Sequence, residues 1–365
     1  MSFKCGIVGL PNVGKSTIFN ALTRGQALAA NYPFATIDPN VGIVAVPDKR
    51  LGTLTEIVAA KKVVPTTVEI VDIAGIVKGA SQGEGLGNQF LSHIAEVDAI
   101  IEVVRCFESK DIIHVSGTVD PLRDMEVIQT ELILRDMDAL AKYKTRFEKG
   151  AKAGDKKAQQ TLALISRYEI AFNEGKPARS CEVSADEKLL LKEIQLITDK
   201  PILYAANVAE EELGKPDSAH VAAVRKRALA ENAAVIVISG KVEEDISRLE
   251  EGEREEFLKA MNMTESGLDQ LAREGHKLLN LISFFTVGET ENRAWDVERG
   301  ATGPKAAGKI HSDFEKGYIR AEVVSFDDFV KYRGEQGARE VGRFRLEGKE
   351  YIVQDGDIMH FRFSV

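Results

Sequence analysis

The pattern of apolar and polar positions changes along the chain and divides it into three kinds of segment. Up to about residue 115, and again from about residue 200, short apolar runs predict strands that alternate with helical segments such as 88–95. The predicted strands are residues 5–8, 41–46, 67–72, 99–104, 201–207 and 233–239. Such alternation is typical of βαβ units around a parallel sheet, so an α/β fold is expected here.

Between these two parts, the chain has the spacing of long helices. Residues 127–140, 158–170 and 189–196 carry apolar side chains at every third or fourth position, and few glycines interrupt them. The glycines in 149–155 separate the first two segments. We therefore predict a helical hairpin of coiled-coil type that is inserted into the α/β domain.

After residue 280 the chain changes to short strands separated by glycines. The predicted strands are residues 282–287, 318–324, 350–353 and 359–365. The expected division is an α/β domain over 1–120 and 204–277, a helical insertion over 121–203, and a small β-rich domain over 278–365.

The turn after the first predicted strand carries the most specific motif. Residues 9–17 read G-L-P-N-V-G-K-S-T and fill every position of the phosphate-binding pattern G-x-x-x-x-G-K-[ST]. Its glycines let backbone N–H groups turn toward phosphate oxygens, and the next helix adds its positive end. Lys15 would stabilise the β- and γ-phosphates during catalysis, and Ser16 would bind Mg²⁺. The predicted phosphate-binding residues are Asn12, Val13, Gly14, Lys15, Ser16 and Thr17.

Two further side chains are candidates for the Mg²⁺ site. Asp72 ends a predicted strand and begins a D-x-x-G pattern, in which the carboxylate holds the Mg²⁺ shell through water. Thr36 lies in a polar segment and is the best candidate for a switch threonine. Thr66 and Thr67 precede a strand and are interpreted as structural. Ser16, Thr36 and Asp72 are therefore the predicted Mg²⁺ ligands.

The segment after the strand at 201–207 departs from the guanine-binding pattern N-K-x-D. Residues 207–210 read N-V-A-E, so Glu210 replaces the aspartate that accepts hydrogen bonds from guanine. A site that lacks a hydrogen-bond partner loses powers of ten in discrimination. We therefore predict ATP in preference to GTP, although an ordinary strand-to-loop turn and a GTP site remain alternatives. The predicted base-binding residues are Asn207, Val208, Glu210, Ser239 and Gly240.

The residues expected to drive hydrolysis also depart from the common pattern. In Ras-like enzymes, a glutamine directly after D-x-x-G orients the attacking water. Ile76 occupies that position and cannot do so, which predicts slow intrinsic hydrolysis. His114, just past a strand end, is the candidate to act on the water, and a structural histidine is the alternative.

Composition excludes several classes of protein. The 365 residues have a net charge of −9, which argues against non-specific coating of nucleic acid. The three cysteines are far apart and predict neither a disulfide framework nor a zinc site. No apolar run approaches the ~18 residues that span a bilayer, and because the N-terminus leads directly into a predicted strand, we expect no secretory signal peptide. We expect a cytoplasmic monomer that neither enters membranes nor reads DNA sequence.

Residues 9–17, 72–75, 79–91 and 207–210 together resemble the YchF family of Obg-related P-loop proteins, and the resemblance covers the whole chain. It implies a Ras-like (OBG-type) G domain, a coiled-coil insertion and a C-terminal TGS domain of β-grasp type. It also implies ATP-preferring hydrolysis and association with ribosomes. Asn12 matches an asparagine that helps related GTPases bind an activating K⁺, and Ile76 matches the family's replacement of the catalytic glutamine.

Basic side chains cluster at the predicted tip of the helical hairpin. They are Lys142, Lys144, Arg146, Lys149, Lys152, Lys156 and Lys157. This cluster suits rRNA phosphates, and a solvated helix face is the alternative. The leading prediction is an ATPase switch that acts on a ribosome or RNA complex. The alternatives are an Obg-class GTPase and a nucleotide-gated RNA- or ribosome-binding adaptor in which hydrolysis is incidental.

Overall fold

The computed structural model describes residues 3–28, 40–73, 94, 96–109, 112, 114–115, 117–191 and 193–364. Thr36, Ile76 and the run 79–91 lie outside the described residues, as do the last two residues of the D-x-x-G pattern. By its internal contacts the chain forms two units, Met1–Ile43 with Glu69–Leu271, and Val44–Val68 with Ala272–Val365.

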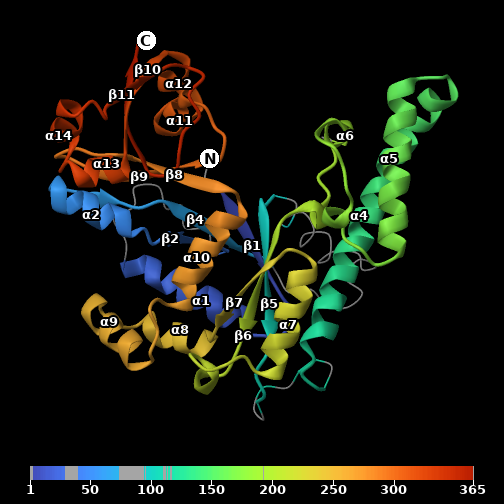
Figure 1. The fold of residues 1–365 in the computed structure, drawn as a ribbon. Coiled ribbons are helices and arrows are strands. Elements are labelled where there is room, and N and C mark those ends of the chain that lie inside the picture. Colours follow the sequence, from blue (N-terminus) through green and yellow to red (C-terminus); the bar gives the residue numbers. More distant parts are fainter. Residues whose placement is uncertain are drawn as a thin grey trace. The chain divides into compact units, whose positions relative to one another are not determined.

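The first unit contains a six-stranded sheet with the order β2-β4-β1-β5-β6-β7 (Figure 1). The strands are β1 (Lys4–Val8), β2 (Val41–Ala45), β4 (Thr67–Asp72), β5 (Ala99–Arg105), β6 (Ile202–Asn207) and β7 (Ala234–Ile238). From β4 to β7, neighbouring strands pair in parallel, and every residue of β5 and β6 is buried. Burial on both faces explains why these strands read as continuous apolar runs. The expected α/β architecture is confirmed.

Helices follow the strands of this sheet. They are α1 (Lys15–Leu28), α7 (Ala219–Ala230), α8 (Gly240–Ile246) and α9 (Glu251–Ala260), and α10 (Gly267–Leu278) crosses the boundary of the two units. Parallel strands place their carboxyl ends along one edge of a sheet, where ligands of open α/β sheets bind. The phosphate-binding loop and the segments that begin at Asp72, Arg105, Asn207 and Ser239 all leave the sheet at that edge.

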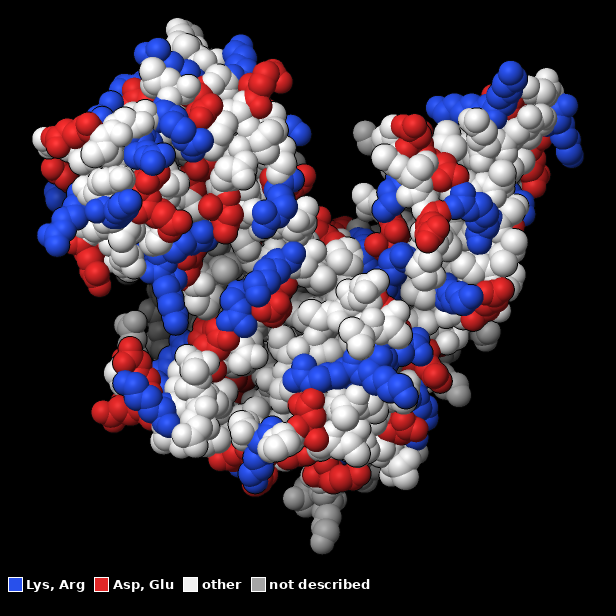
Figure 2. All heavy atoms as spheres, viewed as in Figure 1, with Lys and Arg blue, Asp and Glu red and all other residues white. Residues whose placement is uncertain are grey.

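The predicted helical hairpin is present, as α4 (Pro121–Lys152) and α5 (Lys156–Asn173) (Figure 1). Asp120 caps the first helix and Asp155 the second, each through a carboxylate that accepts backbone N–H groups. Gly154, with a φ of 88°, makes the turn. The helices share a core around Leu140 and Tyr168. Lysine and arginine side chains gather around the α4–α5 turn (Figure 2).

The helix predicted over 189–196 is wrong. A short helix, α6 (Ala185–Leu190), ends near the start of that range. The chain beyond it forms a 3₁₀ turn, η3 (Ile197–Asp199). The buried Asp136 carboxylate on α4 accepts the N–H groups of Ile197 and Thr198, both at 2.8 Å. These bonds fix the backbone in a turn, a tertiary effect that helical spacing does not reveal.

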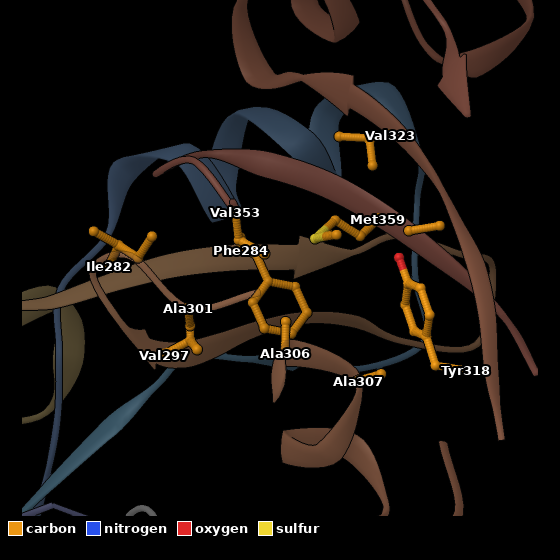
Figure 3. Close-up of a cluster of buried hydrophobic side chains, with 11 residues drawn as sticks. Ile282, Phe284, Val297, Ala301, Ala306, Ala307, Tyr318, Val323, Val353 and Met359 are labelled. Atoms are coloured by element: carbon orange, nitrogen blue, oxygen red, sulfur yellow. The ribbon is translucent and has the colours of Figure 1, made fainter. Parts of the chain in front are cut away.

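The second unit also contains a six-stranded sheet, with the order β11-β10-β12-β8-β9-β3. Its strands are β3 (Val63–Val64), β8 (Leu281–Thr286), β9 (Asn292–Glu298), β10 (Tyr318–Ser325), β11 (Arg345–Glu347) and β12 (Asp357–Phe363). Its further helices are α2 (Lys49–Ile57), α11 (Gly303–Ile310), α12 (Ser312–Lys316), α13 (Phe326–Lys331) and α14 (Glu335–Glu340). One apolar core surrounds Phe284, Tyr318 and Met359 (Figure 3). A second includes Leu54 and Phe329.

Residues 44–68 pack with this second unit, although the expected division places them in the α/β domain. Strand β3 pairs in parallel with β9, and the Asn292 amide donates to the carbonyl of Val58 at 2.9 Å. Leu51 and Leu54 of α2 join the core that contains Phe329. Neither α2 nor β3 was predicted from the sequence, and the sheet that β3 joins was therefore missed as well.

Three strands of the second unit, β3, β9 and β11, were not predicted. Residues 350–353, which were predicted as a strand, form only an isolated bridge at Ile352. None of the helices in the described part of the chain combines the length and apolar character needed to cross a bilayer.

Candidate nucleotide-binding site

The phosphate-binding loop joins β1 to α1, the context that the motif requires. Asn12 and Gly14 adopt left-handed backbone conformations, with φ of 63° and 95°. A Cβ atom on Gly14 would lie 2.1 Å from Asn207 Nδ2, so only glycine fits there. The N–H of Ile18 donates to the carbonyl of Gly14 at 3.0 Å and begins the hydrogen bonding of the helix. The backbone thus has the curled shape that places N–H groups around an anion.

Lys15 and Asp72 form an ion pair at the rim of this loop. The pair brings the carboxylate at the end of β4 next to the ammonium group at the start of α1. Their side chains are 10% and 22% exposed, so both are largely shielded from water. Ser16 is exposed and follows Lys15 directly in the chain. Three of the predicted phosphate and Mg²⁺ residues are therefore close neighbours.

A cavity of about 840 Å³ extends from the loop across the strand ends. The loop contributes Leu10, Pro11, Asn12, Gly14, Lys15, Ser16 and Thr17, and the predicted base site contributes residues 207–211 and 239–241. Phe107, Glu108, Ser109 and Ile112, from the segment after β5, also line it. The volume is in the range of sites for cofactor-sized ligands. The structure therefore brings the predicted base-binding residues and all the predicted phosphate-binding residues except the buried Val13 together around one cavity.

Asn207, at the end of β6, connects the two ends of the cavity. Its side-chain amide donates to the carbonyl of Val13 at 2.8 Å, and its side-chain oxygen accepts the N–H of Gly240 at 2.9 Å. The residue is only 3% exposed. Asn207 therefore fixes the phosphate-binding loop relative to the turn that begins α8, and its predicted contact with a base stays a prediction.

Glu210 is already engaged by a neighbouring side chain. Its carboxylate accepts a hydrogen bond from Lys241 Nζ at 2.7 Å, across the mouth of the cavity. This contact holds the pKa of the Lys241 ammonium above its ordinary value. Both side chains are substantially exposed, at 36% for Glu210 and 71% for Lys241. The Glu210 carboxylate, at the acidic position of the base motif, is thus bound to Lys241 in this conformation.

The donor set near the loop suits Mg²⁺. This ion prefers hard oxygen ligands and usually keeps several waters, and the Ser16 hydroxyl and Asp72 carboxylate offer such oxygens beside Lys15. Thr36, the third predicted ligand, lies outside the described residues. No cluster of three or more acidic, histidine or cysteine side chains that could hold a metal occurs in the described ranges. A P-loop site does not need such a cluster of protein ligands, because substrate phosphates complete the coordination of Mg²⁺.

His114 is held away from the cavity lining. It is 4% exposed, and its Nε2 lies 2.7 Å from Asp124 Oδ2 on α4. Arg123 lies beside the same carboxylate, at 3.3 Å. A catalytic role would require this segment to move, because His114 does not line the cavity in the described conformation. The assignment stays a prediction.

Two residues at this site were missed by sequence reasoning. Arg105 ends β5 and is 1% exposed, and its guanidinium donates to three backbone carbonyls. Phe107 lines the cavity, and its ring centroid lies 4.4 Å from that guanidinium. The sequence carried a signal for Arg105. This arginine directly follows the predicted strand 99–104, and a charged side chain at the end of such a strand needs a polar partner when it is buried.

Two family models match parts of the chain. Residues 4–142 match a model described as a 50S ribosome-binding GTPase. Residues 281–364 match YchF-GTPase_C, which is described as a protein of unknown function (DUF933).

Full-length relatives give a stronger result. The Ribosome-binding ATPase YchF of Bacillus subtilis (strain 168) is 55% identical, and that of Escherichia coli O157:H7 is 52% identical, each over 100% of both chains. The solved structure of the Schizosaccharomyces pombe YchF GTPase is 38% identical with a TM-score of 0.89, and the match covers 99% of this chain and 98% of that chain. The bacterial relatives are named as ATPases and the yeast protein as a GTPase. This chain matches all three over its full length or nearly so. The chain belongs to the YchF family.

Proposed function

We propose that this protein binds ATP in preference to GTP, hydrolyses it slowly, and uses this cycle as a switch on the ribosome. The names of the bacterial relatives, Ribosome-binding ATPase YchF, support both the nucleotide and the partner. The cavity at the carboxyl ends of β1, β5, β6 and β7 supports the nucleotide site.

The observation that carries the ATP preference is the pairing of Glu210 with Lys241. A guanine-binding carboxylate must accept two hydrogen bonds from the base, and this one is one methylene longer and bound to Lys241 Nζ at 2.7 Å. Val208 stands where guanine-specific enzymes carry a lysine. Adenine has no donor at its N1 and no N2 amine, so it does not need the missing acceptor. Guanine would lose both hydrogen bonds.

Competitive binding of ATP and GTP tests this proposal. We expect wild-type protein to bind ATP more tightly. The double variant Val208→Lys, Glu210→Asp restores the N-K-x-D pattern and should shift the preference toward GTP by about tenfold or more. The double variant Leu229→Lys, Glu255→Asp makes similar changes on exposed helix positions and should leave the preference unchanged. A wild-type preference for GTP would favour the Obg-class GTPase instead.

For the phosphate end, we propose that Lys15 stabilises the triphosphate and that Ser16, Thr36 and Asp72 hold Mg²⁺. Bound Mg²⁺ would neutralise charge on the β- and γ-phosphates. In the described conformation Asp72 pairs with Lys15, so nucleotide binding requires Lys15 to exchange this carboxylate for phosphate oxygens. Asn12, which lines the cavity, is the candidate K⁺ ligand, and replacement of K⁺ by Na⁺ should then lower the hydrolysis rate.

His114 is the candidate that acts on the attacking water, once it is released from Asp124. The variant His114→Ala should slow hydrolysis and leave nucleotide affinity unchanged. If the rate is also unchanged, His114 is structural, as its present position against Asp124 favours. If the protein binds and releases its partner in response to ATP without hydrolysing it, the protein is instead the nucleotide-gated adaptor.

For the ribosome, we propose that the α4–α5 turn contacts rRNA phosphates. Of the basic residues in this region, Lys144 and Arg146 pair with Glu169 and Glu193. The others form no ion pair within the described part of the chain: Lys142, Lys149, Lys152, Lys156 and Lys157. Figure 2 shows lysine and arginine side chains concentrated at one end of the hairpin. Unpaired cations can release counterions from phosphates, the main source of affinity for nucleic acid.

A further inference from the structure

We propose that Arg105 is a positioning residue for the nucleotide, which holds the phosphate-binding loop in its anion-binding shape from behind. This inference rests on the proposed nucleotide site but not on the identity of the base. Arg105 ends β5, and its neighbour across the sheet, in register, is Asn207 at the end of β6. Both side chains are buried beneath the loop.

The two side chains hold consecutive carbonyls of the loop. The Arg105 guanidinium donates to the carbonyl of Asn12 at 3.4 Å, and the Asn207 amide donates to the carbonyl of Val13 at 2.8 Å. A trans peptide is planar, so its C=O and N–H point in opposite directions. Holding these two carbonyls toward the sheet therefore turns the N–H groups of Val13 and Gly14 away from it. Those N–H groups belong to the part of the loop that surrounds an anion.

Arg105 also holds a second segment that lines the cavity. Its guanidinium donates to the carbonyl of Phe107 at 3.1 Å and to that of Ile112 at 2.9 Å. The side chains of both residues line the cavity. One buried group thus connects the phosphate-binding loop to the cavity-lining segment after β5.

The charge of Arg105 matters as much as its geometry. Among the described residues, no carboxylate forms an ion pair with it, and its partners are neutral carbonyls. Burial lowers the pKa of the guanidinium, because the charged form is poorly solvated, and the more distant carboxylates of Glu108 and Asp124 oppose this shift only in part. A triphosphate bound in front of the loop would bring negative charge toward this buried cation. A preorganised charge of this kind needs no reorganisation when the anion arrives.

Binding measurements on Arg105→Gln and Arg105→Lys test the proposal. The ligands are ATP, GTP, adenosine and inorganic tripolyphosphate. Loss of hydrogen bonds from a charged donor should weaken ATP, GTP and tripolyphosphate by about tenfold or more in Arg105→Gln. Adenosine should change by less than about twofold, because it lacks the phosphates. Arg105→Lys keeps the charge but cannot reach three carbonyls, so an intermediate loss is expected.

A matched control separates positioning from simple loss of stability. Arg179 is also largely buried, donates to Glu231 at 2.9 Å, and does not line the cavity. Arg179→Gln should lower the melting temperature without changing triphosphate affinity. In hydrogen exchange without nucleotide, the peptide over residues 9–17 should exchange faster in Arg105→Gln than in Arg179→Gln.

The proposal is overturned if both Arg105 variants bind tripolyphosphate within about twofold of wild type, or if adenosine is weakened as much as ATP. A wild-type preference for GTP would instead contradict the proposed function and leave the result for Arg105 valid.

Discussion

Gly14 shows at the scale of one residue how the sequence determines the phosphate site. Its φ of 95° is costly for any residue with a side chain, and a Cβ atom would meet Asn207 Nδ2 at 2.1 Å. The motif fixes this glycine, but only the fold reveals that the conflict is with Asn207. The sequence placed both residues at the nucleotide and assigned Asn207 to the base, whereas its described bonds are to the loop and Gly240.

The variant Gly14→Ala should abolish detectable ATP binding, because the side chain displaces Asn207 and distorts the loop. The backbone strain alone should lower the free energy of unfolding by about 1–2 kcal/mol, measured by urea denaturation. Gly52→Ala on α2 is the control, since a Cβ there meets nothing within 4 Å. The control should stabilise the protein slightly, and unchanged ATP binding in Gly14→Ala would refute the geometry described for the loop.

Helix α10 begins at a buried carboxylate, which makes its stability depend on pH. Glu243 on α8 accepts the N–H groups of Gly267 at 2.7 Å and Leu268 at 3.3 Å. Burial raises the pKa of Glu243 to about 7, and these two hydrogen bonds oppose the shift only in part. The folded protein therefore holds this proton more tightly than the unfolded chain does. The stabilisation is fully present below the unfolded pKa and is lost as pH rises toward 7.

We expect the free energy of unfolding of wild type, relative to Glu243→Gln, to fall by about 3 kcal/mol between pH 4 and pH 8. The variant stays neutral throughout, so its own curve lacks this contribution. Glu244→Gln, on the same helix and partly exposed, is the control. Parallel curves for wild type and Glu243→Gln would show that Glu243 has no raised pKa.

The α4–α5 hairpin illustrates how far helices can be predicted from sequence. The apolar spacing and the glycines of the turn are local signals, and both helices were predicted from them; the structure adds the capping residues Asp120 and Asp155. The prediction at 189–196 failed because α6 ends at Leu190, and the turn that follows at Ile197–Asp199 bonds to Asp136, more than fifty residues away in the chain. Local signals cannot report such a bond.

The charge at the hairpin turn predicts salt-dependent binding to ribosomes. Replacement of Lys149, Lys152 and Lys156 by alanine should weaken ribosome binding and reduce the slope of log affinity against log salt by about 2–3. Replacement of Lys215, Lys226 and Lys259, exposed elsewhere on the first unit, is the control. Equal binding by both triple variants, measured by co-sedimentation, would place the contact outside this turn.

At the scale of the whole molecule, the chain order and the spatial units differ. The chain leaves the first unit at residue 44, contributes α2 and β3 to the second sheet, and returns at residue 69. Neither α2 nor β3 was predicted from its own pattern, and the contacts that join them to the second unit, with Asn292 and the core around Phe329, are distant in the chain. The nucleotide site was more predictable, because the phosphate-binding loop is one continuous motif. Arg105 was missed because its partners are backbone carbonyls.

We propose that ATP and the ribosome bind to this protein in a coupled way. Affinities for ATP and GTP, measured with and without purified ribosomes, test it most directly. Coupling is reciprocal, so a ribosome that changes ATP affinity must itself bind differently in the presence of ATP. We predict that ribosomes change the affinity for ATP by about fivefold or more, with a smaller effect on GTP. Equal ATP affinity with and without ribosomes, or a coupling confined to GTP, would contradict this account.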